Sequence, residues 1–463
     1  MPDDLAAARR LALAFLTAEW NPQSMAEHGR RVLGLKGSPK WILRLAEQVC
    51  RQYPAAPPPT QLELSRLLAT SGRLRQAIRR REQSNQPLDS GTLLLPPMPM
   101  RPVVGLPAGW ELPNLTSAGQ LAAWLDITPD ELDWFADVRR LQRDRPPGPA
   151  RHYQYRWIPK AGGRQRLLES PKPRLKQVQR SLLHGLLDRI PPHPAACAFR
   201  RGHSLASFLA PHAGRRILLH VDLRHFFPSI SSARVHALFR TVGYPEAMAR
   251  SLTGLCTTST PRQELDRPQD REAEAALHRL YGSPHLPQGA PTSPALANLC
   301  ARRLDVRLNG LARRTGADYT RYADDLLFSG GHELERMLSR FRVWVCAIAI
   351  DEGFTIRHRK TRELPRSGRQ QVAGVVLNEK LNQPRAEYDR LRATLHNCIR
   401  HGAASQNRNG HPRFREHLGG RIAWVNMLNP NRGARLKQLF QQIDWPEEST
   451  GSPPADSQPA KPD

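Results

Sequence analysis

The chain has 463 residues, of which 39% are hydrophobic, so it is long enough for about three domains with buried cores. It carries 69 Lys and Arg against 42 Asp and Glu, and the formal net charge of +27 indicates an anionic partner such as nucleic acid. No apolar run approaches the ~20 residues that a membrane span needs, and residues 1–10 lack the apolar core of a signal peptide. We therefore expect a cytoplasmic protein with no membrane partner. The six Cys are scattered without a CxxC pair, which favours reduced thiols and argues against a zinc site.

Residues 1–105 are expected to form a separate, basic, helical N-terminal region. Proline clusters at 54–59 and 95–102 mark turns or connectors between short helical stretches. Apolar spacing indicates one helix around 41–49 and another over 62–78, with Arg at the exposed positions. Such a region would either pack against the rest of the protein or contact RNA.

Residues 106–150 are predicted to be a helical lead-in to the next domain. Ser117 precedes one helix, and Thr128 opens a segment that combines an N-cap, a proline in the first turn and early acids before a second helix. Residues 151–168 then alternate aromatic or apolar with basic residues around a Gly-Gly pair. This pattern predicts a basic β-hairpin.

The middle of the chain mixes helical and strand patterns without an internal repeat. In chain order we expect a helix over 173–190, a strand over 217–223, an acidic polar insertion near 262–275, a helix over 294–311, a hairpin over 319–329 and a helix over 334–345. Residues 446–463 are rich in Pro, Ser, Glu and Asp without apolar periodicity, so we expect a disordered tail.

Three acidic residues carry the clearest chemical signal. Asp324 and Asp325 are adjacent and flanked on both sides by β-prone residues, where like charges repel unless a cation lies between them. A third acid, Asp222, ends the apolar run 217–221 and so lies at the end of a buried strand. Three carboxylates at strand ends are what two Mg²⁺ ions require for in-line phosphoryl transfer, one ion acting on the primer hydroxyl and the other on the triphosphate.

Three segments resemble, in this order, successive core motifs of reverse transcriptases: 221–230 (VDLRHFFPSI), 286–294 (LPQGAPTSP) and 322–325 (YADD). The resemblance points to bacterial retron and group II intron-like enzymes and covers roughly residues 150–440. It implies an α+β right-hand polymerase with fingers, a palm of antiparallel sheet packed by helices, and a helical thumb. Fingers and palm would occupy 151–378, and the thumb 379–445.

The same resemblance implies a catalytic metal site. Asp222, Asp324 and Asp325 would form the triad that binds two Mg²⁺ ions, and Leu223 would offer its backbone carbonyl to a metal. Phe227 matches the aromatic gate that clashes with a ribose 2′-hydroxyl and so favours deoxynucleotides. A core position beside the preceding Phe is the alternative for this residue.

Other residues match the nucleotide-binding positions of these enzymes. Gln288 would lie against the incoming nucleotide, where Gly289 lets the backbone approach closely. In the basic hairpin, Lys160 and Arg166 match the cations that hold the triphosphate, with Arg164 as the substitute and a solvated charge run as the alternative.

Three further matches complete the resemblance. Lys360 corresponds to the palm lysine that acts as general acid toward pyrophosphate, although a surface role stays open. The alternating segment 371–378 resembles the primer-grip hairpin, with Val372 and Gly374 at the grip. The Arg-rich helices of the thumb would follow phosphates. A template-side loop is matched by Phe199, Gly202 and Ser204.

Two departures separate the chain from the typical retron set. Retron enzymes usually carry Asn-Ala-x-x-His before the first catalytic strand and Val-Thr-Gly at the primer grip. The aligned residues here are 208–212 (FLAPH) and 372–374 (VAG). His212 and the other His are expected to be packing or phosphate-side residues rather than metal ligands.

The expected activity is RNA-directed DNA polymerase, copying a structured partner RNA into DNA in a retron-like setting linked to phage defence. Its partners would be template and primer RNA, the DNA product, deoxynucleoside triphosphates, a retron-type non-coding RNA and an effector protein. One alternative is a group II intron-like maturase, against which the lack of a His/Cys-rich endonuclease segment after the thumb argues. The other is a non-catalytic RNA-binding protein on a polymerase scaffold, against which the three clustered acids argue.

Overall fold

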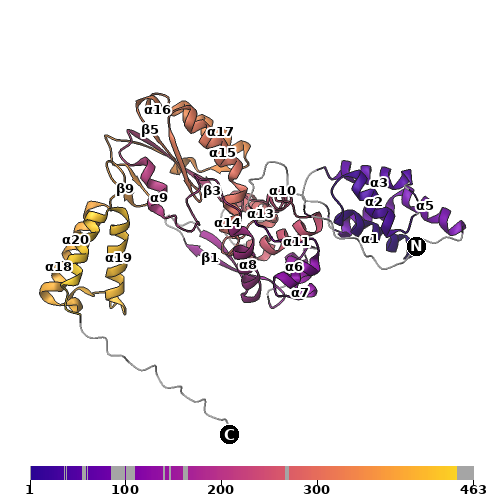
Figure 1. Cartoon of the computed structure of the whole chain (residues 1–463), viewed down its shortest axis with the longest axis horizontal. Helices are drawn as coiled ribbons and strands as arrows, with labels where there is room; N and C mark the ends of the chain where they lie inside the picture. Colours follow the sequence, from indigo (N-terminus) through magenta and orange to yellow (C-terminus); the bar gives the residue numbers. More distant parts are fainter. Residues whose placement is uncertain are drawn as a thin grey trace, which may run out of the picture.

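The computed structural model describes residues 2–35, 37, 39–54, 59, 61–84, 100, 110–138, 141–144, 148–159, 165–265 and 271–445. They form an α+β fold in which helices surround small antiparallel sheets, as predicted. Figure 1 shows an N-terminal helical cluster, a central part around the largest sheet, and a C-terminal helical cluster along the long axis. Each has its own buried apolar core. None of the described helices is long and apolar enough to cross a membrane.

The N-terminal cluster shares one core, to which Leu11, Phe15, Met25 and Ile42 contribute. Its described helices are α1 (Pro2–Thr17), α2 (Pro22–Val32), α3 (Lys40–Gln52), α4 (Gln61–Thr70) and α5 (Gly72–Gln83). The prediction of one helix over 62–78 is wrong, because the chain breaks at Ser71 into α4 and α5. Glycine is a poor helix-interior residue, and Gly72 instead begins α5.

The lead-in to the central part contains the two predicted helices. They are α6 (Ala118–Trp124) and α7 (Pro129–Ala136). The Ser117 side chain caps α6, and Thr128 and Glu131 form a reciprocal capping box at the start of α7. Local capping chemistry therefore sets both helix starts.

The predicted basic hairpin is confirmed as β1 (Tyr153–Pro159) paired antiparallel with β2 (Gln165–Pro171). The turn between them lies outside the described residues, and with it Lys160 and Arg164. The predicted helix over 173–190 is shorter than expected. It forms α8 (Pro173–Gly185), and a separate 3₁₀ turn follows at Leu187–Arg189.

The largest sheet has the strand order β4-β5-β3-β6, with β7 also paired to β3, and every pairing is antiparallel. Its strands are β3 (Ile217–Arg224), β4 (Asp318–Tyr322), β5 (Asp325–Gly330), β6 (Thr355–Ile356) and β7 (Arg362–Pro365). The central strand β3 is buried along most of its length, as its Ile, Leu and Val content predicts. The predicted strand at 217–223 and hairpin at 319–329 are both confirmed.

Helices pack over this sheet and beside the hairpin. They are α9 (Leu205–Leu209), α10 (Ser232–Thr241), α11 (Glu246–Cys256), α12 (Arg262–Leu265), α13 (Arg271–Gly282), α14 (Ser293–Cys300), α15 (Arg302–Arg314), α16 (His332–Arg336) and α17 (Leu338–Asp351). α15 packs on β4 and α17 on β6. The predicted helix over 294–311 divides at Ala301, and the one over 334–345 divides at Met337. The acidic insertion near 262–275 holds α12 and the start of α13.

The C-terminal cluster packs around Leu391, Leu395, Ile422 and Leu436. Its helices are α18 (Arg385–His401), α19 (Phe414–Leu428) and α20 (Pro430–Gln441). A small hairpin of β8 (Gln371–Val372) and β9 (Val375–Val376) precedes it. The predicted tail at 446–463 lies outside the described residues.

His212 is fully buried beside the central sheet. Its Nδ1 lies 2.7 Å from Ser329 Oγ and its Nε2 lies 2.8 Å from Thr320 Oγ1, so the imidazole links β5 to β4. Burial lowers the pKa of His212 to about 3. The side chain is therefore a neutral packing residue.

The free energy of unfolding should fall as the pH drops from 6.5 toward about 3, because the unfolded chain binds a proton at His212 that the folded chain excludes. The folded pKa is depressed, so this stabilisation is present above the unfolded pKa and is lost below it. His212→Asn removes this group, so the free energy of unfolding of the variant should change less steeply with pH. The difference in slope should be about 1.4 kcal/mol per pH unit between pH 6.5 and about 3. Chemical denaturation across the window measures the slope, and equal slopes for the two proteins would contradict a buried neutral imidazole.

Candidate active site

Three carboxylates lie together at one end of the central sheet. β3 and β5 pair so that Asp222 lies directly opposite Asp325, and Asp324 lies in the turn that joins β4 to β5. The Leu223 N–H donates to the Asp324 carbonyl oxygen at 2.8 Å, which ties this turn to the end of β3. Ala323 adopts a φ of +55°, the left-handed conformation that closes a two-residue hairpin turn. The structure thus brings together the three predicted acids.

Burial and the neighbouring carboxylates both act on Asp324. Burial raises the pKa of Asp324 above its usual range, and the Asp325 and Asp222 carboxylates raise it further. Arg166 on β2 acts in the opposite direction. A bound cation would relieve this repulsion, because an opposite charge favours the ionised carboxylate.

Cationic side chains lie against both carboxylate oxygens of Asp222, which is 3% exposed. Lys360 Nζ donates to Oδ2 at 2.9 Å, and Arg357 Nη1 forms an ion pair with Oδ1 at 3.0 Å without a well-aligned hydrogen bond. The Arg357 backbone N–H also donates to the Asp222 carbonyl oxygen at 2.8 Å. The predicted residue Lys360 therefore lies at the carboxylates. Arg357 was not predicted, because one more Arg in so basic a chain carries no signal.

His220 is a second site residue that the sequence did not reveal. Its Nε2 lies 2.7 Å from Asp325 Oδ1. The available signal was a single polar residue within the apolar run 217–221. Two of the three carboxylates therefore have a basic partner: Asp222 pairs with Lys360 and Arg357, and Asp325 contacts His220.

The donor chemistry of this cluster fits a divalent metal ion. Hard cations such as Mg²⁺ prefer carboxylate and carbonyl oxygens, which the three acids and the Leu223 carbonyl can supply. The repulsion at Asp324 is what such an ion would relieve. Within the described ranges, no three Asp, Glu, His or Cys side chains are arranged to hold an ion as they stand. In this structure Lys360 and Arg357 pair with the two Asp222 oxygens that a metal ion would use.

Phe227 belongs to a cluster of aromatic rings next to the carboxylate turn. Its ring centroid lies 6.1 Å from that of Phe199, which in turn lies 6.5 Å from that of Tyr322. Phe227 is only partly buried, whereas Phe226 is 4% exposed and stacks on Phe354 at 5.6 Å. Of the two neighbours, Phe226 is therefore the core residue, and Phe227 keeps an accessible face.

The predicted template-side residues lie just before α9. Phe199 has a φ of +58° and is 50% exposed, an unfavourable combination for a bulky residue. Gly202 also has a left-handed φ, and Ser204 forms a reciprocal cap with Ser207 at the start of α9. An exposed ring held in this way is suited to stacking on a nucleobase.

Gln288 and Gly289 lie against the β1–β2 hairpin. The Gln288 carbonyl accepts from the Glu169 N–H at 2.9 Å. Gly289 has a φ of +138°, and a Cβ there would lie 3.0 Å from the Glu169 carbonyl oxygen. Glycine is thus required for approach to β2, which differs from the expected reason of approach to a nucleotide. Arg166 is exposed on the same strand, and its charge acts on Asp324.

The predicted primer-grip residues form the tip of the β8–β9 hairpin. Ala373 and Gly374 both have a left-handed φ, at +48° and +81°, as a two-residue hairpin turn requires. Val372 is buried in a core that includes Leu428 of α19, with Trp424 packed against it. The hairpin is therefore anchored on the C-terminal cluster, and Gly374 is exposed at its tip.

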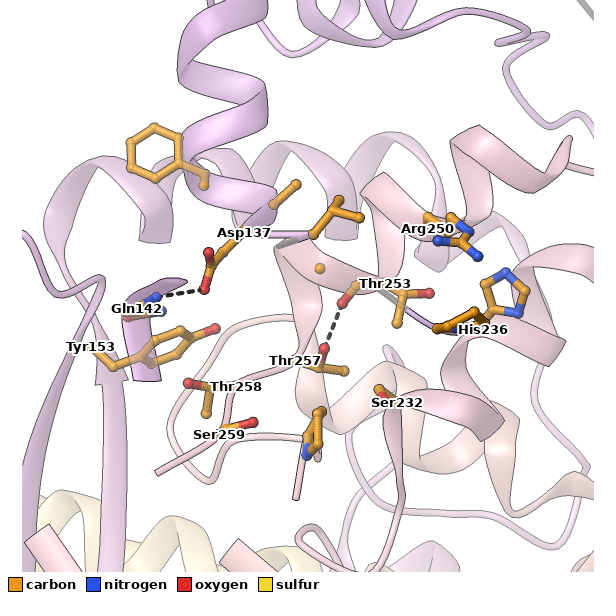
Figure 2. Close-up of a pocket in the computed structure, with 16 residues that line it drawn as sticks. Asp137, Gln142, Tyr153, Ser232, His236, Arg250, Thr253, Thr257, Thr258 and Ser259 are labelled. Carbon is orange, nitrogen blue, oxygen red and sulfur yellow. Dashed lines mark hydrogen bonds between the residues drawn. The ribbon is translucent and has the colours of Figure 1, made fainter. Parts of the chain in front are cut away.

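A separate polar cavity of about 110 Å³ lies among α7, α10, α11 and β1 (Figure 2). Two hydrogen bonds join groups of its lining: the Gln142 N–H donates to Asp137, and the Thr257 hydroxyl donates to the Thr253 carbonyl. None of the predicted site residues lines it. Its volume is below the roughly 300–1,000 Å³ of typical ligand pockets, so the carboxylate cluster is the better candidate site.

Comparisons with known proteins identify a matching family model and several relatives of this chain. Residues 158–375 match the family model of reverse transcriptase (RNA-dependent DNA polymerase). The chain is 43% identical over 300 residues to the retron Mx65 reverse transcriptase of Myxococcus xanthus, covering 65% of this chain and 66% of that relative. It is 35% identical over 345 residues to retron Mx162 reverse transcriptase of the same organism, covering 71% and 68%. It is 32% identical over 282 residues to retron Ec86 reverse transcriptase of Escherichia coli, covering 61% and 77%.

Proposed function

The chain belongs to the retron-type bacterial reverse transcriptases, which are RNA-directed DNA polymerases, and we propose that it copies a structured partner RNA into DNA at the carboxylate cluster. The observation that carries this proposal is the pairing of Asp222 opposite Asp325 with Asp324 in the adjoining turn. Such a cluster has no structural use in a protein of charge +27 that only binds RNA.

We assign the central sheet to the palm, the β1–β2 hairpin and its neighbouring helices to the fingers, and α18 to α20 to the thumb. In residue ranges, fingers and palm would occupy 151–378 and the thumb 379–445, preceded by the lead-in at 106–150 and the N-terminal region at 1–105. The separate apolar cores of the N-terminal region and of α18 to α20 support these two outer divisions, whereas the lead-in, fingers and palm share one core.

The reaction proposed for this site is two-metal phosphoryl transfer. Asp222, Asp324, Asp325 and the Leu223 carbonyl would hold two Mg²⁺ ions. When bound, these ions supply activation of the primer hydroxyl and neutralisation of the triphosphate charge. Arg166 would add positive charge on the triphosphate side.

Two further side chains would contribute to the same step. Lys360 would give a proton to the leaving pyrophosphate, and its hydrogen bond of 2.9 Å to Asp222 supports a position near the reaction. Gln288 and Gly289, which contact β2, would form part of the surface on which the incoming nucleotide lies. Val372 and Gly374 would position the 3′ end of the primer, since their hairpin packs against α19.

The partners follow from the family. A reverse transcriptase requires an RNA template and deoxynucleoside triphosphates, and we propose that it meets them in the cytoplasm. The reported relatives are named as retron reverse transcriptases, which favours a retron-type non-coding RNA over the group II intron alternative. We also propose an associated effector protein and a role in phage defence. Sequencing the DNA beside the gene tests the non-coding RNA, since a retron needs its RNA encoded there.

The polymerase proposal is tested directly with the purified protein. Primed RNA, Mg²⁺ and deoxynucleotides should give template-dependent DNA, and omission of Mg²⁺ should abolish it. A protein that binds the primed RNA but never extends it would support the non-catalytic alternative.

Phe227→Ala should admit ribonucleotides, because it removes the ring that would clash with a 2′-hydroxyl. We expect the preference for deoxynucleotides to fall at least about tenfold, in line with the roughly 1–3 kcal/mol that shape selection in a pocket provides. Deoxynucleotide incorporation should persist. Single-nucleotide extension with dNTP and rNTP measures the ratio, and Phe226→Ala, which empties a core position, is the comparison. An unchanged ratio in Phe227→Ala would place the gate elsewhere.

A further inference from the structure

The N-terminal cluster contains a basic groove between α3 and α5. Its volume is about 360 Å³, and Trp41 and Arg44 from α3 line it together with Arg73, Arg80 and Arg81 from α5. Leu74 and Ile78, on another face of α5, are buried in the core of the cluster. Helix packing therefore leaves the arginine face of α5 turned toward Trp41. We call this site the Trp41 groove.

The positive charge of the groove is not neutralised within the described part of the chain. Arg44 and Arg80 are exposed and form no ion pair there, and Arg73 donates to the neutral side chain of Gln48 at 2.9 Å. Acids of the same cluster are engaged elsewhere: Glu27 pairs with two arginines of α2, and Glu19 pairs with Arg240 of the central part. A partner with several negative charges would supply the missing compensation.

An aromatic side chain among arginines favours single-stranded nucleic acid over other polyanions. Trp41 is partly exposed in the groove, and an indole provides a stacking surface that any nucleobase can use. A duplex hides its bases within the stack, whereas a single strand presents bases and phosphates together. An acidic protein surface would use the charges but not the ring.

We propose that the Trp41 groove binds a single-stranded segment of the partner RNA, with a base stacked on Trp41 and the adjoining phosphates on Arg44, Arg73 and Arg80. This inference rests on the proposed function, which makes a structured RNA the natural polyanion for the chain. The N-terminal cluster lies at the opposite end of the described molecule from α18 to α20, with the central sheet between them (Figure 1). The groove would therefore hold RNA away from the segment being copied, and would help to select the cognate molecule.

The test uses the full-length protein and a labelled 12-nucleotide single-stranded RNA, with an unlabelled primed RNA occupying the polymerase site. Arg44→Glu combined with Arg80→Glu should weaken binding at least about tenfold and lower the slope of log affinity against log salt by about 1.4, since each single-strand phosphate contact contributes about 0.7. Trp41→Leu should weaken binding about fivefold or more through lost stacking, with the salt slope retained.

The matched control is Arg9→Glu combined with Arg66→Glu, which makes the same charge change at exposed arginines of α1 and α4, outside the groove. It should change the affinity less than twofold. Equal losses in the control and the groove variant, or no loss in the groove variant, would overturn the proposal. Extension of the primed RNA should continue in every variant. Failure of extension in the wild-type protein would instead count against the polymerase assignment, independently of the binding result.

Discussion

Asp324→Asn should abolish DNA synthesis and leave RNA binding intact. The substitution keeps the shape of the side chain and removes the charge that would hold a metal ion, while the basic surface that binds RNA is untouched. Loss of this stabilisation of the transition state should lower the extension rate at least about 10³-fold. Asp222→Asn should act similarly, since it removes the second strand-end carboxylate. Extension of a primed RNA measures the rate, and fluorescence anisotropy on the same RNA measures the binding.

The matched control is Asp318→Asn, on the same β4–β5 hairpin. Asp318 is partly exposed and pairs with Arg215, so its loss should leave the extension rate within about twofold of wild type, as for a surface ion pair. A separate readout is stability without metal. Because burial, together with the Asp325 and Asp222 carboxylates, raises the pKa of Asp324, its charge destabilises the folded state near neutral pH, and Asp324→Asn should melt at the same or a higher temperature. Near-wild-type extension by Asp324→Asn would refute the metal-site assignment.

The sequence indicated which acids form this cluster, but not how they are arranged. Asp222 and the Asp324–Asp325 pair stood out because each interrupts or ends an apolar, β-prone run. That Asp222 lies directly opposite Asp325 depends on pairing strands about 100 residues apart, which no local pattern records. The contact of Arg357 with Asp222 depends on the same long-range register.

Among the helices too, only features with a local sequence signal were predicted. α6 and α7 were predicted well because their caps are local signals. α1 was not assigned, although its buried Ala7, Leu11, Ala14 and Phe15 follow the i, i+4, i+7, i+8 spacing of one apolar helix face. The break between α4 and α5 had a signal in Gly72 that the apolar spacing on either side outweighed.

A buried ion pair beneath the β4–β5 turn was equally invisible in the sequence. Arg321 and Asp305 are both fully buried, and the guanidinium donates to the two carboxylate oxygens at 2.7 Å each. Burial opposes the charge, but Asp305 raises the pKa of Arg321. Arg321 also donates to Asn298 at 3.1 Å and to the Ala323 carbonyl at 3.2 Å, immediately before Asp324. The pair therefore connects α15 to the turn that carries the acids.

Asp305→Ala should destabilise the fold by about 3–5 kcal/mol, the cost of leaving a buried charge without its partner. Asp351→Ala is the matched control, because Asp351 also pairs with an arginine of α15, Arg307, but is 65% exposed. Its effect on the free energy of unfolding should be far smaller. Chemical denaturation of the variants measures the difference.

The double variant Asp305→Ala with Arg321→Met distinguishes two causes of destabilisation: the unpaired buried charge of Arg321 and the lost packing of Asp305. If the unpaired guanidinium causes the destabilisation, the double variant should regain at least about 1 kcal/mol over Asp305→Ala alone, because a buried ion pair can often be replaced by apolar residues. DNA synthesis should nevertheless stay low, since the Ala323 carbonyl loses its Arg321 donor and the turn that positions Asp324 is no longer held. A double variant no more stable than Asp305→Ala would attribute the loss to the cavity and the Tyr319 hydroxyl, which donates to Asp305 at 2.8 Å. Full recovery of synthesis together with stability would show that Arg321 supports the fold and does not position the turn that carries Asp324.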